Sequence, residues 1–153
     1  MRIKVSDLIA DVIADSGISD VFTVVGGGAM HLNDSFGHHK RLKCWYNHHE
    51  QASAIAAESY ARIDNKMAAV CVTTGPGGTN AITGVVGGWL DSIPMIIISG
   101  QVRYDTTARS TGLPLRSMGD QEFDITKAVG CMTKYCEMVT DPNRILYCTR
   151  PPS

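Results

Sequence analysis

Glu50 is the side chain whose type and position could best do chemistry in this 153-residue chain. It follows a short apolar and aromatic run at 42–46, which has the length of a strand, and it opens a run at 52–60 whose apolar residues recur at helical spacing. A carboxylate in the first turn of a helix interacts favourably with the helix macrodipole, by about 0.3–1 kcal/mol. Small neighbouring residues also leave room for a ligand. Residue type alone therefore allows either a helix-capping role or a functional role for Glu50.

Two glycine-rich turns could bring the backbone close to a ligand. The first, at 26–28, follows an apolar run and precedes a helical segment, which is the position of a dinucleotide fingerprint, but that motif needs glycine where His31 stands. The second, Gly-Pro-Gly-Gly-Thr-Asn at 75–80, could expose N–H groups to an anion but lacks the lysine of a P-loop. For each turn, close backbone packing remains an alternative to ligand binding.

Composition argues against several classes of partner. The net charge of −1 gives no basic footprint for nucleic acid. The longest apolar run, 93–98, is far shorter than the roughly 20 residues of a bilayer-spanning helix, and the amino terminus lacks the build of a signal peptide. We therefore expect a cytoplasmic protein without a membrane partner. The five histidines lack ligand spacing, so no metal site is expected, and the five cysteines, without a CxxC pair, are expected to be free, buried thiols.

The order of apolar runs predicts the fold. Continuous apolar runs indicate strands covered on both faces by helices, and we expect them at 21–25, 43–47, 68–73, 95–99 and 132–139. Helical segments are expected at 5–17, 29–36, 50–62 and 80–90, and Asp141-Pro142 is a helix start. The polar stretch 101–123 reads as a long connection of the kind that is often functional. We predict one α/β domain, doubly wound, with a mostly parallel sheet and helices on both faces.

Three of these stretches resemble, in order and spacing, the pyrimidine-binding (PYR) domain of thiamine-diphosphate enzymes of the acetolactate synthase and pyruvate oxidase group. Residues 49–62, which contain Glu50, resemble its signature helix. Residues 73–80 resemble its Gly-Pro-Gly-Ala-Thr-Asn loop, and residues 91–102 resemble the strand and turn that follow. The resemblance implies a PYR-type domain over residues 1–147. It also implies that residues 148–153 are a short tail and that a longer multidomain chain is truncated there.

The resemblance assigns a role to each matched residue. Glu50 would hydrogen-bond the N1′ nitrogen of the aminopyrimidine and shift its 4′-amino group toward the imino form. Gln121 would face the substrate, because Gln121-Glu122 stands where acetolactate synthases have Phe-Gln-Glu, with Asp120 in place of the phenylalanine. The remaining cofactor-binding residues that the resemblance implies are Gly27, Gly28, Pro76 and Asn80.

The implied activity is that of a transferase or lyase acting on a small 2-keto acid, by acetolactate synthase-like carboligation or by decarboxylation. In this family a Gly-Asp-Gly motif binds the diphosphate and magnesium, and the sequence has no such motif. A diphosphate-binding domain of another chain would therefore complete the site, in a homodimer or homotetramer, and this chain alone would be inactive. Flavin (FAD) is compatible with the group. Two alternatives stay open, a separate PYR subunit of a two-chain decarboxylase and a noncatalytic nucleotide-binding domain.

Overall fold

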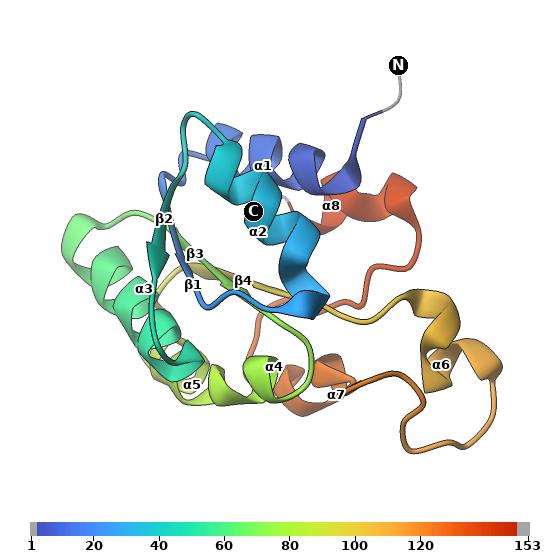
Figure 1. Cartoon of the computed structure of the whole chain (residues 1–153). Coiled ribbons are helices and arrows are strands. Elements are labelled where there is room, and N and C mark those ends of the chain that lie inside the picture. Colours follow the sequence, from blue (N-terminus) through green and yellow to red (C-terminus); the bar gives the residue numbers. More distant parts are fainter. Residues whose placement is uncertain (1–2, 150–153) are drawn as a thin grey trace.

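The computed structural model describes residues 3–149, which form an all-parallel sheet of four strands in the order β2-β1-β3-β4 (Figure 1). The strands are β1 (Asp20–Thr23), β2 (Lys43–Tyr46), β3 (Ala68–Val72) and β4 (Met95–Ser99). Helices alternate with the strands, as parallel pairing requires a crossover between neighbours. The predicted doubly wound α/β fold is confirmed. The predicted tail at 148–153 lies largely outside the described residues.

Helices cover both faces of the sheet (Figure 1). One face carries α1, α2 and α8, and the other carries α3, α4 and α5. The helices, including short 3-10 turns, are α1 (Val5–Asp15), η1 (Gly27–Ala29), α2 (Met30–His38), α3 (Glu50–Asp64), α4 (Pro76–Asn80), α5 (Ile82–Leu90), η2 (Tyr104–Thr106), α6 (Ala108–Thr111), α7 (Ile125–Val129), η3 (Pro142–Arg144) and α8 (Ile145–Cys148). No helix in the described part of the chain has the length and apolarity needed to cross a membrane.

The central strand β3 explains why the sheet can be covered on both sides. All five of its residues are fully buried, because Ala68, Val70 and Val72 face one hydrophobic cluster while Ala69 and Cys71 face the other. Small and β-branched side chains let helices pack closely on each face. The continuous apolar run in the sequence was therefore a correct indication of a doubly covered strand.

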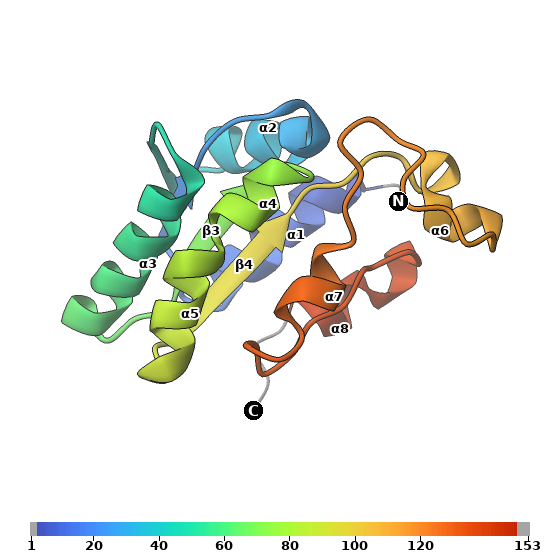
Figure 2. The ribbon, with the colours of Figure 1, turned by 90° about the horizontal axis from the view of Figure 1, so that it is seen from below.

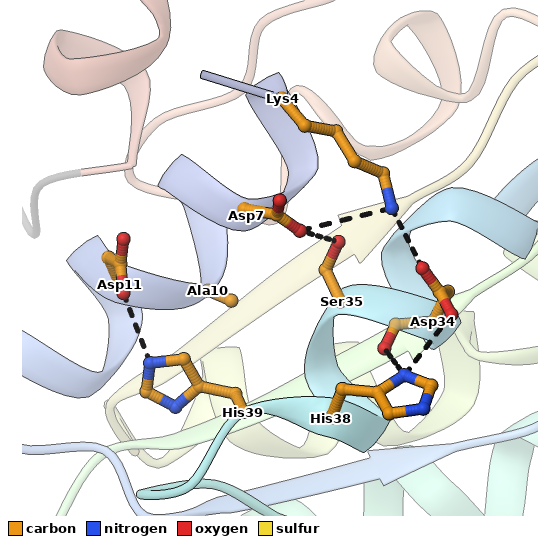
Figure 3. A pocket seen from close by; sticks show the side chains of 8 residues that line it. All are labelled: Lys4, Asp7, Ala10, Asp11, Asp34, Ser35, His38 and His39. Carbon is orange, nitrogen blue, oxygen red and sulfur yellow. Dashed lines mark hydrogen bonds and ion pairs between the residues drawn. The ribbon is translucent and has the colours of Figure 1, made fainter.

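Polar side chains join α1 to α2 on the outside of one layer (Figure 3). Lys4 Nζ lies 2.8 Å from Asp34 Oδ2, and His39 Nε2 lies 3.2 Å from Asp11 Oδ1. Ser35 Oγ donates to Asp7 Oδ1 at 2.6 Å. These side chains line a hollow of about 400 Å³ in which the charged groups already pair with one another.

The fifth predicted strand, at 132–139, is wrong. In the structure this segment is irregular, and Met132 N–H bonds to Val129 O at 3.0 Å, turning the chain back on α7. Thr133 Oγ1 also donates to Val129 O, and Glu137 pairs with Arg144. Such local bonds compete with a sheet ladder. A groove of about 1430 Å³ is lined by both β4 and this segment, so β4 is the edge of the sheet among residues 3–149.

Residues 101–123, here called the 101–123 connection, leave the sheet from β4 and carry η2 and α6 (Figure 2). The connection stands on the opposite side of the molecule from α3 (Figures 1 and 2). Its two ends are tied together, since Gln101 Nε2 donates to Phe123 O at 2.8 Å. The long polar stretch is thus a loop whose two ends are held together by a hydrogen bond.

Candidate functional site

The residues singled out from the sequence gather where the parallel strands end. The glycine turn 26–28 follows β1, Glu50 follows β2, residues 75–80 follow β3, and Gly100 follows β4. Open α/β sheets bind ligands outside the carboxyl ends of their strands. We call residues 75–80 the 75–80 loop.

Glu50 is the first residue of α3, and its side chain turns toward the 75–80 loop. The residue is 9% exposed, and its Oε2 accepts a hydrogen bond from Asn80 Nδ2 at 3.0 Å. The helix cap is supplied by the preceding residue, because His49 Nδ1 accepts the Gln51 N–H at 3.1 Å. Capping of α3 therefore does not account for the position of the Glu50 carboxylate.

The 75–80 loop approaches Glu50 closely because it contains glycine. A Cβ at Gly77 would lie 3.4 Å from Glu50 Oε1 and 2.6 Å from the Thr73 methyl group. Pro76 is the first residue of α4, where proline's missing N–H is tolerated. Asn80, the last residue of α4, then faces Glu50 across the turn. This side of the site is thus formed by a very short helix with glycines at its N-terminal end.

The glycine turn after β1 packs against the end of β3. Gly28 N donates to Thr73 Oγ1 at 3.1 Å, and a Cβ at Gly28 would lie 3.0 Å from the Thr74 side chain. Gly100, after β4, comes so close that an added Cβ would be 2.3 Å from Gly28 O. Gly27 is exposed, with open space where a Cβ would stand.

Gln121 reaches the same region through its backbone. Its carbonyl oxygen lies 3.4 Å from Thr74 Oγ1 and would be 2.2 Å from a Cβ at Gly75. Thr74 Oγ1 donates to Gln101 Oε1 at 2.6 Å, and Gln101 is the residue that closes the 101–123 connection. The side chain of Gln121 is exposed. The connection therefore leans on the 75–80 loop at Gly75.

Two pKa shifts mark the surroundings of the site. Burial raises the pKa of the Cys71 thiol to about 12, despite a hydrogen bond from Thr23 that acts in the opposite direction. At Glu122, partial burial opposes ionisation, but backbone N–H groups of Ala108, Met118 and Gly119 outweigh it and lower the pKa of the carboxyl. Among residues 3–149, no three His, Cys, Asp or Glu side chains are grouped so that they could hold a metal ion.

Comparison with known proteins adds the family. Residues 3–128 match the family described as thiamine pyrophosphate enzyme, N-terminal TPP binding domain. The chain belongs to this family. It is 38% identical over 101 residues to the acetolactate synthase large subunit of Haemophilus influenzae, covering 66% of the chain and 18% of that protein. It is 35% identical over 133 residues to the Lactococcus lactis large subunit (85% and 21%) and 31% identical over 141 residues to acetolactate synthase 1, chloroplastic, of Oryza sativa (90% and 20%).

This TPP-binding domain spans about a fifth of the length of the curated relatives it matches. Thiamine pyrophosphate, here called thiamine diphosphate, is thus the cofactor of its family, and the residues at the strand ends fit the cofactor's pyrimidine half. A buried carboxylate is a strong acceptor for a ring N–H group. Asn80 occupies Oε2, and Gly77 keeps the space beside Oε1 free of a side chain. The cofactor, when bound, would supply the electron sink for breaking or forming a bond next to a carbonyl carbon.

Some of the residues singled out from the sequence are in contact with one another in the structure, and others are not. Glu50 and Asn80 meet directly, Gly28 packs on Thr73, and Gln121 touches the loop through its backbone. Pro76 and Gly27 are exposed at the edges of the two turns.

Sequence reasoning missed the residues that hold these turns together. They are Thr73, Thr74, Gly77, Gly100, Gln101 and Glu122. Five of them lie inside stretches already recognised as motifs, and Glu122 follows Gln121, so proximity to a motif was the available signal.

Proposed function

We propose that this chain provides the aminopyrimidine-binding half of an acetolactate synthase-like active site that acts on a small 2-keto acid. The observation that carries the proposal is the Glu50 carboxylate, buried at the strand ends and bonded to Asn80 while His49 caps the helix. Family membership and the names of the relatives support the cofactor and the reaction class.

Each residue then has a physical task. Glu50 accepts a hydrogen bond from the protonated N1′–H of the aminopyrimidine and so favours the form in which the 4′-nitrogen is an imine that can act as a base. Asn80 fixes the orientation of the carboxylate by holding Oε2. Gly28 and Gly77 keep the backbone near the ring, and Pro76 and Gly27 border it. In this proposal Gln121 faces the keto acid.

The other half of the site belongs, in this proposal, to the diphosphate-binding domain of a second chain, which also holds magnesium. A dimer or tetramer is therefore the working form. A site divided in this way keeps the catalytic carboxylate and the diphosphate ligands on separate rigid domains, so neither is sufficient alone.

The test replaces Glu50 by glutamine in an enzyme assembled from this chain and a diphosphate-binding partner. We expect proton exchange at the cofactor's C2 and kcat both to fall by at least about 10²-fold, the usual scale for losing an acid–base partner. The melting temperature should hardly change, because His49 still caps α3. Glu58→Gln is the matched control, since it makes the same chemical change on the same helix at a residue that pairs with Arg62.

Near-normal C2 exchange in the Glu50→Gln enzyme would overturn the proposal. Product analysis with pyruvate separates the two reaction types. Acetolactate would support carboligation, whereas acetaldehyde and carbon dioxide alone would replace it with simple decarboxylation.

A further inference from the structure

The Glu122 carboxylate joins separate parts of the 101–123 connection by hydrogen bonds. Glu122 accepts hydrogen bonds from the Ala108 N–H, at 2.8 and 2.9 Å to its two oxygens, and from the Met118 and Gly119 N–H groups at 2.8 and 3.1 Å. Ala108 begins α6, while Met118 and Gly119 lie in the irregular part of the connection that returns toward the domain. Glu122 therefore joins two parts of the connection that are about ten residues apart in sequence.

The residues on either side of Glu122 make the contacts that fasten the connection to the domain. The carbonyl of Gln121 rests against Gly75 near the Thr74 hydroxyl, and the carbonyl of Phe123 accepts from Gln101 Nε2. Gln121 holds a positive φ of 53°, which is unusual for a residue other than glycine. Its backbone is thus kept in an uncommon conformation directly beside the Glu122 anchor.

The chemistry of the anchor calls for an ionised acid. A carboxylate is an acceptor at both oxygens and can satisfy several N–H groups at once. A glutamine of the same shape would turn an NH₂ group toward at least one of these backbone donors. The N–H donors also lower the pKa of Glu122, so the carboxylate is charged at neutral pH.

We propose that Glu122 is a positioning residue, whose carboxylate holds the 101–123 connection so that Gln121 stays against the 75–80 loop beside Glu50 and Asn80. The effect of Glu122 on the substrate rests on the proposed function, in which Gln121 faces the keto acid. The anchoring of the connection by Glu122 rests on the hydrogen bonds alone, so the two effects can be tested separately.

The first experiment uses this chain by itself. Hydrogen exchange is compared between the unsubstituted chain, Glu122→Gln and Glu122→Asp, with Glu137→Gln as the matched control, because Glu137 pairs with Arg144 outside the connection. We expect the amides of Ala108, Met118 and Gly119 to exchange at least about tenfold faster in Glu122→Gln, because local opening is governed by local hydrogen bonds. Glu122→Asp should restore part of the protection, and β3 and α3 should be unchanged.

Trypsin gives a second reading of the same chain, because the connection contains Arg103, Arg109 and Arg116. Cleavage at these sites should accelerate in Glu122→Gln and not in Glu137→Gln. Unchanged exchange and cleavage in Glu122→Gln would overturn the proposal. Equal acceleration in β3 and in the connection would also overturn it, because Glu122 would then support the whole fold.

The second experiment uses the assembled enzyme. Glu122→Gln should raise KM for the 2-keto acid by about tenfold while C2 exchange of the cofactor stays within about twofold, since uniform substrate binding is lost and Glu50 is untouched. A loosened connection with unchanged KM would refute the positioning role. Normal proton exchange at the cofactor's C2 in Glu50→Gln would instead refute the proposed function. The amide hydrogen exchange measured on the isolated chain would still decide the role of Glu122.

Discussion

Gly75→Ala is the substitution for which the structure gives the clearest expected magnitude. Gly75 caps α4 with φ of 56° and ψ of −118°, and a Cβ there would lie 2.2 Å from the carbonyl oxygen of Gln121. A carbon and a carbonyl oxygen in weak contact sit about 3.3–3.6 Å apart, so the overlap is about 1 Å. Relief requires movement of backbone on one side or the other, because both groups belong to the main chain.

Two terms add to the cost. The unusual backbone conformation costs about 1–3 kcal/mol for a residue with a Cβ, and the overlap adds about 1–3 kcal/mol by analogy with overpacked cores. We therefore expect a loss of about 2–6 kcal/mol in the free energy of unfolding. Gly112→Ala is the matched control, because Gly112 has φ of 67° and open space around its Cβ position. It carries only the conformational cost of about 1–2 kcal/mol.

Urea unfolding of both variants, read by far-ultraviolet circular dichroism, measures the difference. Replacing glycine by alanine lowers the conformational entropy of the unfolded chain, and the resulting gain in stability is common to both variants, so it cancels in the comparison. Hydrogen exchange then shows whether the connection has moved away from Gly75. The reasoning is refuted if Gly75→Ala is no less stable than Gly112→Ala and the connection keeps its protection.

Three further outcomes are expected. This chain alone, supplied with thiamine diphosphate and magnesium, should not turn over pyruvate, because half of the proposed site is on another domain; a steady release of carbon dioxide would contradict this. Cys71, whose pKa burial raises to about 12, should react with a thiol reagent at neutral pH only on unfolding, whereas the exposed Cys131 should react at once and Cys136, whose pKa is raised by partial burial, should react more slowly than Cys131. Partial burial of Asp20 is outweighed by hydrogen bonds from Ser19, Trp45 and Tyr60, which lower the pKa of its carboxyl. The stabilisation of the folded state by the ionised Asp20 is therefore complete above the unfolded pKa of about 3.9 and disappears as pH falls through the lower folded pKa. Asp20→Asn should be less stable than the unsubstituted chain at pH 6, and a gap that persists unchanged at the lowest pH at which both fold would contradict this assignment.

The sequence predicted best what depends on neighbouring residues. The apolar run at 95–99 coincides with β4, and the stripe that begins at Val5 became α1, which ends before Gly17 at φ of 85°. Asp141 was correctly interpreted as a helix start, since its side chain accepts from the Asn143 N–H. The expectation of free thiols is confirmed, but the expectation that they are buried is wrong for Cys131, just before the segment that failed to form a strand, and for Cys136 within it.

Contacts between distant segments could not be predicted in the same way. The strand at 132–139 failed because its apolar residues satisfy a strand pattern while its backbone bonds locally to α7. The bond between Glu50 and Asn80 joins residues 30 positions apart, and no local pattern encodes it. Glu122 was overlooked because its partners are backbone N–H groups, which every residue except proline has, so residue types gave no signal.

The edge position of β4 affects how the protein must be handled. Its residues, Met-Ile-Ile-Ile-Ser, are uncharged and rich in β-branched side chains, and β4 pairs only with β3 among residues 3–149. Natural sheets protect such edges with charge, proline or a covering segment, because an apolar strand with free backbone groups recruits other strands. We therefore expect aggregation of the isolated chain to increase with its concentration. A lysine placed at an outward position of this strand is the simplest way to keep it monodisperse.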